Sequence, residues 1–498
     1  MRCKGSMTIY LCLIMTILIS IIVTGIRSAA VADARLQIAS AADLGLYSLF
    51  GQYDKTCLEQ THLLFLEGGY GEEYLQMNQV YRTLEQDITY NFLAGQGTAM
   101  QKNIWNAAVK KGSITGYTLA TDAGGNVFKG QVIDYMEKTL GAQAVRLLIN
   151  KLQDEDTIVE KQQEDNGTKD SSDAITEYEQ LKADKKREEE SYDLSEAAEG
   201  ENISEQNEDI PIDPDFVNPI EVIKRLREMG LLTLVIPNPD NVSRNAIDLA
   251  GSVSGRSLRR GMGVIAYHPD VDSVKGNLLF QEYIMQNCGS YTDTAEKRSI
   301  QYELEYILQG KSSDIENLKG VVNQLLLMRE AANAAHLMAD PGKKAQLSSA
   351  ALAISVAIGM PYAESAIEGI LLLCWAFGES ILDIRELMAG GKIALVKDSS
   401  SWQLSIENLP YLAEGLDSFR KSSDKGLSYN DYLRVLLTLR SGQDKIMRCM
   451  DIMEIRVRQN EGKQNFRLDS CIAALEIQME MSVCNRMFSI QRNYGYDM

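Results

Sequence analysis

Residues 5–26 form the most apolar stretch of the chain, GSMTIYLCLIMTILISIIVTGI, with Lys4 before it and Arg27 after it. As an uncharged α-helix this stretch extends about 33 Å, which matches a hydrocarbon core of about 30 Å. Cleaved secretory signals have shorter apolar regions of about 7–15 residues, although Ser28 to Ala30 offer the small residues of a cleavage site. The pattern favours a retained transmembrane anchor over residues 7–26.

The helical pattern continues beyond this apolar stretch. Residues 27–54 contain no proline, and small and apolar residues recur along them at helical spacing. The residues of this face are Val31, Ala34, Ile38, Ala41 and Ala42. We therefore expect one helix to run from the anchor into the following segment. That segment either packs on the protein's own domain or forms a stalk that packs against other subunits.

The charges beside the anchor predict its orientation. Arg2 and Lys4 precede the anchor and Arg27 follows it, so the difference in positive charge is slight. A short basic tail normally stays in the cytoplasm, and a long following domain can be exported whatever its charge. We expect a single-pass protein of the cell membrane, with residues 1–6 inside and the bulk of the chain extracytoplasmic.

The rest of the chain reads mostly as helix. The stretch GYTLATDAGGNVFKGQVIDYMEKTL, residues 116–140, predicts a short strand, a Gly-Gly turn and a helix. Further along, residues 231–239 predict a strand, and residues 391–397 with 402–408 predict a β-hairpin. The predicted fold class is mainly α with minor β (α+β).

A second membrane hairpin is a weaker interpretation of residues 345–378. Their first part consists largely of Ala and Ser, and their second part has only ten uncharged residues, GILLLCWAFG. A membrane-spanning helix needs about 20 apolar residues, and carboxylates such as those of Glu364 and Glu368 are costly inside a bilayer. We predict two buried core helices. The helix before them should stop near Asp340-Pro341-Gly342.

Residues 154–215 differ in composition from the rest. They hold 23 acidic and 6 basic residues, which is −17 of the chain's net charge of −19. With few large apolar residues, such a segment cannot offset its ordering entropy by burial. We predict a disordered linker, with a surface helix over Glu177–Glu190 as the alternative. The overall acidity argues against a nucleic-acid partner, which would need a basic surface.

These patterns divide the chain into successive segments. The expected segments are a tail (1–6), an anchor (7–26), a stalk helix with a first extracytoplasmic region (27–153), an acidic linker (154–215) and a larger helix-rich domain with a small β-hairpin (216–498).

Motifs for metal or nucleotide chemistry are weak or missing in the sequence. His62, His268 and His336 are far apart and lack the spacing of metal ligands. Gly261 and Gly263 loosely fit a dinucleotide-binding motif, but a basic stretch precedes them instead of an apolar strand. We predict no catalytic residue, metal, cofactor or small-molecule ligand, and we do not expect an enzyme.

Eight cysteines are spread along the chain, and none has C-x-x-C spacing. They are Cys3, Cys12, Cys57, Cys288, Cys374, Cys449, Cys471 and Cys484. Cys374 lies in an apolar helix and should be a buried thiol. Export would permit disulfides, and the last three cysteines could include a pair.

Two groups of carboxylates stand out on predicted helices. Glu303 and Glu305 alternate with Tyr302 and Tyr306, which favours a solvated face with an aromatic side chain packed inward. Trp375 and Glu379 are four residues apart and share a helix face. Core packing with a paired carboxylate is the favoured interpretation of the second group, with Arg329 or Arg385 as the partner.

The N-terminus resembles subunits of Tad-type pili and secretion systems. The resemblance rests on the short basic tail, the single span and the following ARLQIA-S-AAD stretch of residues 34–43. The whole chain also resembles an uncharacterised family of Gram-positive membrane proteins associated with Tad-like loci, through residues 4–11, 301–318, 372–387 and 426–437. This resemblance implies a family and a location, and no known activity.

Prepilin-type processing is one consequence of the first resemblance. Cleavage after Gly5 would leave Ser6 as the first mature residue, but the fifth position is then Tyr10, where many type IV pilins carry glutamate.

Two functional hypotheses follow. The first is a membrane-anchored structural or assembly component of a Tad-like pilus or secretion apparatus, whose partners are the bilayer and other subunits. The second is a free-standing envelope protein that binds a ligand or hydrolyses a substrate.

Overall fold

The structure, a computed structural model, describes residues 4–94, 108–140, 170–196, 217–236, 238–263, 268–294, 298–416, 418–419, 426–483 and 486–496. Most of these residues are helical and a smaller part forms sheet, so the predicted fold class is confirmed. The chain divides into two compact units. The first contains Met1–Val145, Asp248–Tyr283 and Gly442–Met498, and the second contains Arg146–Ile247 and Ile284–Ser441.

The two units differ from the successive segments that the sequence predicts. Residues 248–283 and 442–498, which that scheme placed in the larger C-terminal domain, belong to the same unit as the N-terminal helix. Residues 442–498 join this unit because the strand Cys471–Val483 pairs with Leu66–Glu67 and Ala108–Leu119, which precede the acidic segment. Within residues 248–283, Met262 forms a bridge with Tyr117.

The first unit combines a long helix with one sheet. Its elements are α1 (Lys4–Phe50), α2 (Lys55–Thr61), β1 (Leu66–Glu67), α3 (Met77–Ala94), β2 (Ala108–Leu119), a helix within 122–140, α8 (Val274–Asn287, which continues into the second unit), α15 (Gly442–Arg458), the 3₁₀ turn η4 (Leu468–Ser470), β5 (Cys471–Val483) and β6 (Arg486–Gly495).

The sheet is antiparallel and has β5 at its centre. β2 pairs with one side of β5, and β1 and β6 pair with the other. The register of β2 shifts at three places, whereas β6 pairs with β5 without interruption from Arg486 to Gly495. The sequence analysis predicted no strands at this C-terminal end.

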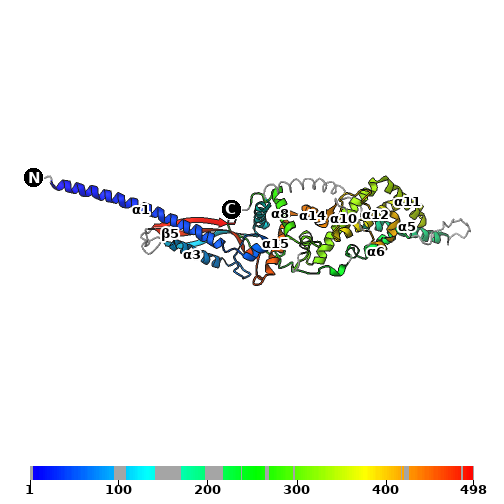
Figure 1. The fold of residues 1–498 in the computed structure, drawn as a ribbon, viewed down its shortest axis with the longest axis horizontal. Helices are drawn as coiled ribbons and strands as arrows, with labels where there is room; N and C mark the ends of the chain where they lie inside the picture. Colours follow the sequence, from blue (N-terminus) through cyan, green and yellow to red (C-terminus); the bar gives the residue numbers. More distant parts are fainter. Residues whose placement is uncertain are drawn as a thin grey trace. The chain divides into compact units, whose positions relative to one another are not determined.

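One face of the sheet carries the C-terminal half of α1 together with α3 (Figure 1). The core between them is apolar. It includes Ile38, Leu46 and Leu49 of α1, Leu84 of α3, and Met481 of β5, each at most 1% exposed. The opposite side chains of β5 alternate outward, with Gln478 and Glu480 exposed. A period of two along β5 therefore separates a buried face from a solvated one.

β2 leads into a left-handed turn and then a helix, as the sequence predicts. Ala123, Gly124 and Gly125 all have positive φ, at 52°, 68° and 87°. Glycine adopts this conformation without the steric cost that a Cβ atom imposes, which explains the Gly-Gly pair. The turn closes with a hydrogen bond from the Gly125 N–H to the Thr121 carbonyl oxygen, at 3.1 Å.

The second unit is built from helices around α12 (Glu364–Met388). Its other elements are α5 (Ser171–Glu196), α6 (Pro219–Glu228), α7 (Leu231–Val235), η1 (Pro239–Asn241), α9 (Glu303–Gln309), α10 (Asp314–Ala339), α11 (Pro341–Ala357), η2 (Pro361–Ala363), β3 (Lys392–Ile393), η3 (Ile406–Tyr411), α13 (Leu412–Gly415), β4 (Leu427–Ser428) and α14 (Tyr429–Leu439). Asp340 ends α10 and caps α11 by accepting from the N–H groups of Gly342 and Lys343, so the predicted stop is confirmed.

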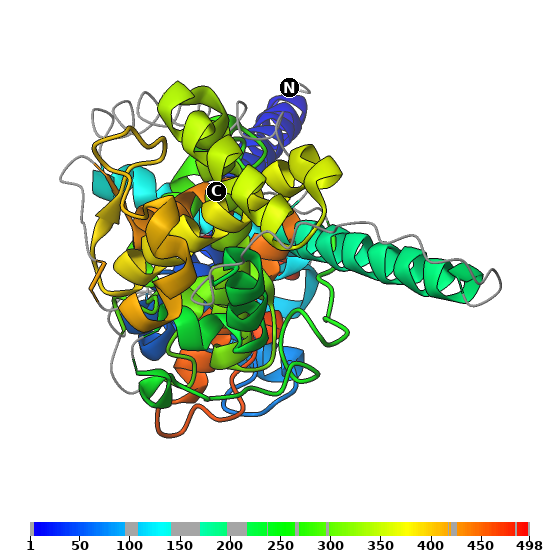
Figure 2. The same cartoon turned by 90° about the vertical axis from the view of Figure 1, so that its right-hand side faces the viewer.

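Part of the predicted disordered linker is a helix. α5 covers Ser171–Glu196, so the alternative of a surface helix is confirmed over Glu177–Glu190 and the helix is longer than expected. Ala174, Ile175 and Tyr178 are buried and hold its first turns in the unit, and its later turns extend away from the neighbouring helices (Figure 2). The predicted disorder at 154–169 and 197–215 lies outside the described residues.

Two predicted strand features in the second unit are wrong. Residues 231–235 form α7 because Gly230, at φ 89°, and a turn from Thr233 to Gly230 begin a short helix there. Residues 391–397 and 402–408 do not pair as a hairpin. Instead β3 pairs with β4, and Ile406–Tyr411 forms a 3₁₀ helix. Local apolar runs this short do not specify strand partners.

Candidate functional site: membrane anchor and interaction surfaces

α1 consists of two halves with opposite surroundings. Every large apolar side chain from Met7 to Ile26 is exposed, between 42% for Val23 and 79% for Met7. Arg27, just after this half, is also exposed. Of the other predicted flank and processing residues, Arg2 lies outside the described residues. Lys4, Gly5 and Ser6 form the first turn of α1.

Two helices of the described residues are long and apolar enough to span a membrane, Met7–Phe50 and Pro361–Met388. The apolar window of the second is 67% buried inside the protein, as in a core helix, whereas that of the first is 0% buried. The predicted burial of α12 is thus confirmed. A signal sequence near an N-terminus passes the same test as an anchor.

The predicted stalk residues face the protein's own core. Ala34, Ile38, Ala41 and Ala42 are at most 4% exposed, and Val31 packs against the same apolar cluster. Within this structure they therefore make the contacts of a helix that packs on its own domain.

A different face of the same half of α1 remains open. Leu36, Leu44 and Tyr47 are 70%, 51% and 65% exposed. Leu36 and Tyr47 are eleven residues apart, which is close to three helical turns, so they lie on one line along the helix. The sequence analysis did not single out these residues, although their spacing was visible in the sequence.

α1 and β6 run in the same direction. The Arg35 guanidinium lies 3.8 Å from the centre of the Phe488 ring, and Arg492 Nε lies 3.0 Å from Asp43 Oδ1. Further along, the Tyr496 hydroxyl donates to the Phe50 carbonyl oxygen at 2.7 Å. Along these three contacts, the residue numbers of α1 and of the C-terminal segment increase in the same direction. The helix therefore lies parallel to the strand.

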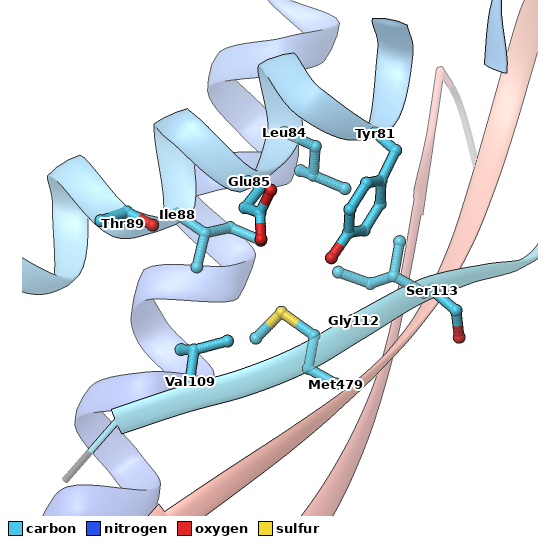
Figure 3. A pocket seen from close by; sticks show the side chains of 10 residues that line it. Tyr81, Leu84, Glu85, Ile88, Thr89, Val109, Gly112, Ser113 and Met479 are labelled. Carbon is cyan, nitrogen blue, oxygen red and sulfur yellow. The ribbon is translucent and has the colours of Figure 1, made fainter. Parts of the chain in front are cut away.

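A small hollow of about 70 Å³ opens between α3 and β2 (Figure 3). Leu84 and Ile88 form its apolar part with Met479, and the Tyr81 hydroxyl points towards Gly112. Burial, and then the nearby Glu85 carboxylate, raise the pKa of Tyr81. Sites for small organic ligands usually hold about 300–1,000 Å³, so this hollow is too small for such a ligand.

The core of the second unit contains a network of charged side chains. The Lys397 ammonium lies between Glu379 and Asp383, and Arg329 Nε donates to Asp383 Oδ2 at 3.1 Å. Each of these four side chains is at most 1% exposed. The predicted pairing of Glu379 is confirmed, but its partner is Lys397 and not Arg329 or Arg385, because Lys397 follows β3 into the core.

Trp375 belongs to the same network. Its Nε1–H donates to the Leu404 carbonyl oxygen at 2.9 Å, and the Leu404 N–H donates to Glu379 Oε2 at 2.8 Å. Burial raises the pKa of Glu379 despite its charged partner. Because these carboxylates have internal partners, the arrangement holds the core together and leaves little charge for a ligand.

Glu303 and Glu305 are buried, so their predicted solvated face is wrong. Glu305 Oε1 accepts from the Tyr291 N–H and from the Tyr429 hydroxyl, each at 2.8 Å. Glu305 Oε2 is buried without a hydrogen-bond partner in the described structure. Burial raises the pKa of Glu305 to about 7. Helix α9 packs against α10 and α14. The local sequence around Glu305 does not reveal this packing.

The three histidines have separate neighbours in the described structure. His268 faces Asp134 at 3.4 Å, whereas His62 stacks on Tyr135 and His336 stacks on Trp402. In the described ranges, no group of three or more His, Cys, Asp or Glu side chains is arranged for a metal.

Cys374 is a buried free thiol, as predicted. Cys449 and Cys471 are buried as well and form no disulfide with each other. Cys484, the third member of the predicted group, lies outside the described residues.

Comparison with known proteins gives one match. A model for a family of unknown function, DUF5702, matches residues 209–483, more than half of the chain. Three of the four stretches that suggested an uncharacterised family lie within this match, and residues 4–11 lie outside it. No curated protein and no solved structure matches the chain. The chain therefore belongs to the family of unknown function DUF5702.

Proposed function

We propose that this protein is a membrane-anchored subunit that acts through protein–protein contacts in a Tad-like pilus or secretion apparatus. One observation carries the proposal: α1 is a single continuous helix whose first half is apolar and exposed and whose second half is part of the core of a folded unit. Such a helix couples the unit directly to a bilayer, because no hinge separates the anchor from the fold.

The orientation follows the charges. Residues 1–6 are inside the cell and everything after Arg27 is outside. The resemblance of the N-terminus to Tad-type pseudopilins supports an assembly role, and the exposed Leu36, Leu44 and Tyr47 provide a surface for neighbouring subunits. Protease added to intact cells should cut the acidic segment around residues 154–215. Protection of that segment would reverse the topology.

Site-specific photocrosslinking in cells tests the assembly role. A benzophenone side chain at Leu36 or Leu44 should crosslink to a pilus or secretion subunit. The matched control is Tyr362, which is 71% exposed and lies in the second unit. If the α1 positions capture no such subunit, or no more than the control position does, the role in assembly is wrong.

N-terminal sequencing of the membrane-extracted protein tests processing. A chain that begins at Ser6 supports cleavage by a prepilin-type peptidase, and an intact tail that begins at or before Cys3 contradicts it.

A further inference from the structure

The two outer edges of the first unit's sheet differ in their protection. On β2, the Tyr117 N–H donates to the Met262 carbonyl oxygen at 2.7 Å, and the Met262 N–H donates back at 2.9 Å. The Tyr81 side chain of α3 lies over the face of β2 at Gly112, where a Cβ atom would lie 2.9 Å from its hydroxyl. Three register shifts also distort β2. Bulges and covering side chains are the usual devices that prevent an edge from pairing with another chain.

Among the described residues, the edge of β6 has neither a register shift nor a bridge to another strand on its outer side. The Tyr496 N–H donates to the Ala473 carbonyl oxygen, and the pairing of β6 with β5 has no register shift. Since antiparallel pairing alternates, the backbone groups of every second residue point away from β5. These outward residues are Met487, Ser489, Gln491 and Asn493.

Little occupies these outward groups. Within the described part of the chain, the one hydrogen bond that reaches them is from Arg492 Nη1 to the Gln491 carbonyl oxygen, at 2.9 Å. β6 contains neither proline nor lysine, the residues that most often block an edge.

Exposed apolar side chains of α1 flank the same edge. The Tyr47 ring packs edge-to-face against Tyr494 of β6, with 6.1 Å between the ring centres, so Tyr47 lies on the β6 side of the helix. Leu36 lies on the same line three turns earlier. Arg35 and Arg492 add positive charge on this side, and Asp43 pairs with Arg492. The open edge and the overhanging helix thus form two walls of one site.

We propose that the β6 edge, with Leu36 and Tyr47 of α1 above it, binds an extended segment of another envelope protein as an added antiparallel or parallel strand. The segment alternates apolar and polar residues. Its apolar side chains face α1, and it carries a carboxylate beside Arg35 and Arg492. Backbone hydrogen bonds give affinity in such strand addition, and alternate side chains give specificity.

A second copy of this chain fits the edge less well. Antiparallel pairing of β6 with its own copy requires a two-fold axis, which reverses the strand direction. Because α1 runs parallel to β6, the copy's anchor would then point the opposite way, away from the shared membrane. Parallel pairing of β6 with the β2 edge of a copy meets Met262, which already bridges Tyr117 at that edge. The exclusion of the antiparallel dimer rests on the proposed membrane anchor.

A pair of synthetic peptides tests the site on the purified full-length protein in detergent. Each has nine residues of alternating valine and threonine, and two central valines are replaced by glutamate in one peptide and by lysine in the other. The glutamate peptide should bind saturably by fluorescence anisotropy, and the lysine peptide at least about tenfold more weakly. Hydrogen exchange should slow at the outward amides of Ser489, Gln491 and Asn493 and stay unchanged at Ile490 and Arg492.

Variants with a matched control locate the binding. The Ser489→Lys/Gln491→Lys double variant places lysines on the edge, and Gln491→Pro removes one outward N–H without removing a hydrogen bond to β5. The control is Gln478→Lys on the central strand, which loses the same Gln478–Ser489 hydrogen bond (3.0 Å) and gains the same type of charge. Both edge variants should weaken the glutamate peptide at least about tenfold, and the control should change binding less than about twofold.

Several results would overturn the proposal. They are failure of both peptides to bind, equal binding to edge and control variants, or protection at amides outside β6. Dimers that the edge variants dissociate would identify a second copy as the occupant instead. The peptide-binding results come from the purified protein. They are therefore independent of whether a pilus subunit is captured by photocrosslinking in cells.

Discussion

The core beneath α1 and the core around α12 use different chemistry. Between α1 and the sheet, the buried side chains are apolar. Between α10 and α12, the buried side chains include Arg329, Asp383, Lys397 and Glu379. Apolar burial is favourable wherever the shape fits, whereas buried charges cost desolvation that only well-placed partners offset. The first core should therefore tolerate changes of hydrogen bonding, and the second should not.

The largest expected effect is in the charged core. Arg329→Met should destabilise the second unit by about 3–5 kcal/mol, because it leaves the buried Asp383 carboxylate without one of its two cationic partners. Unfolding in denaturant, followed by the fluorescence of Trp375 and Trp402, measures this. The control is Lys182→Ala, which breaks an exposed ion pair with Glu221 and should cost about 0–1 kcal/mol. If both variants lost the same stability, the buried charges would contribute no more than an exposed ion pair, and the proposed difference between the two cores would be wrong.

In the apolar core, Ile38→Ala should cost about 2–4 kcal/mol, since Ile38 is fully buried and the cavity can close only in part. Hydrogen exchange at the inward amides of β5 reports the stability of this unit. The loss should show no dependence on pH between 5 and 8, because the change involves no titrating group. A pH-dependent loss would mean that charges also stabilise this core.

Glu305 should make the second unit sensitive to pH. Its pKa in the folded protein is about 7, above its ordinary value of 4.5. Between these values the folded state binds more protons than the unfolded state, so stability falls as the pH rises through this window and is lowest above it. Glu305→Gln should flatten this slope, on the order of 1–3 kcal/mol between pH 5 and 8. An unchanged slope in the variant would assign the pH dependence elsewhere.

The smallest effect should come from the open face of α1. Leu36→Ala should change the stability of the first unit by less than about 0.5 kcal/mol, because Leu36 is 70% exposed. Hydrogen exchange at the same β5 amides compares this variant with Ile38→Ala. Both variants place alanine on the same helix, so the difference between them reports the effect of burial and not of helix propensity. A loss as large as that of Ile38→Ala would mean that this face is covered.

Much of the molecule could be read from local patterns. The apolar run at residues 7–26, the helical spacing of Ala34, Ile38 and Ala42, the Gly-Gly turn and the stop at Asp340 all depend on neighbours within a few residues. Their physical causes, which are hydrophobic periodicity, positive φ and helix capping, act over the same short range. Those predictions are confirmed by the structure.

What the local patterns missed depends on partners far along the chain. β5 shows a period of two, yet its partners β2 and β6 lie on either side in space, and β2 is more than 350 residues away for the pair Thr115 and Glu476. Glu305 became buried because Tyr291 and Tyr429 surround it, and Lys397 became the partner of Glu379 because β3 carries the following residues into the core.

By itself, the sequence determined the apolar N-terminal helix long enough to span a membrane, its continuation beyond residue 27 and the helical class, because these follow from local periodicity and helix length. Tertiary structure alone decided which charges are buried, which strands join α1 and which edge of the sheet stays open. Those outcomes arise from long-range packing, where burial of one side chain depends on residues that only the fold brings together.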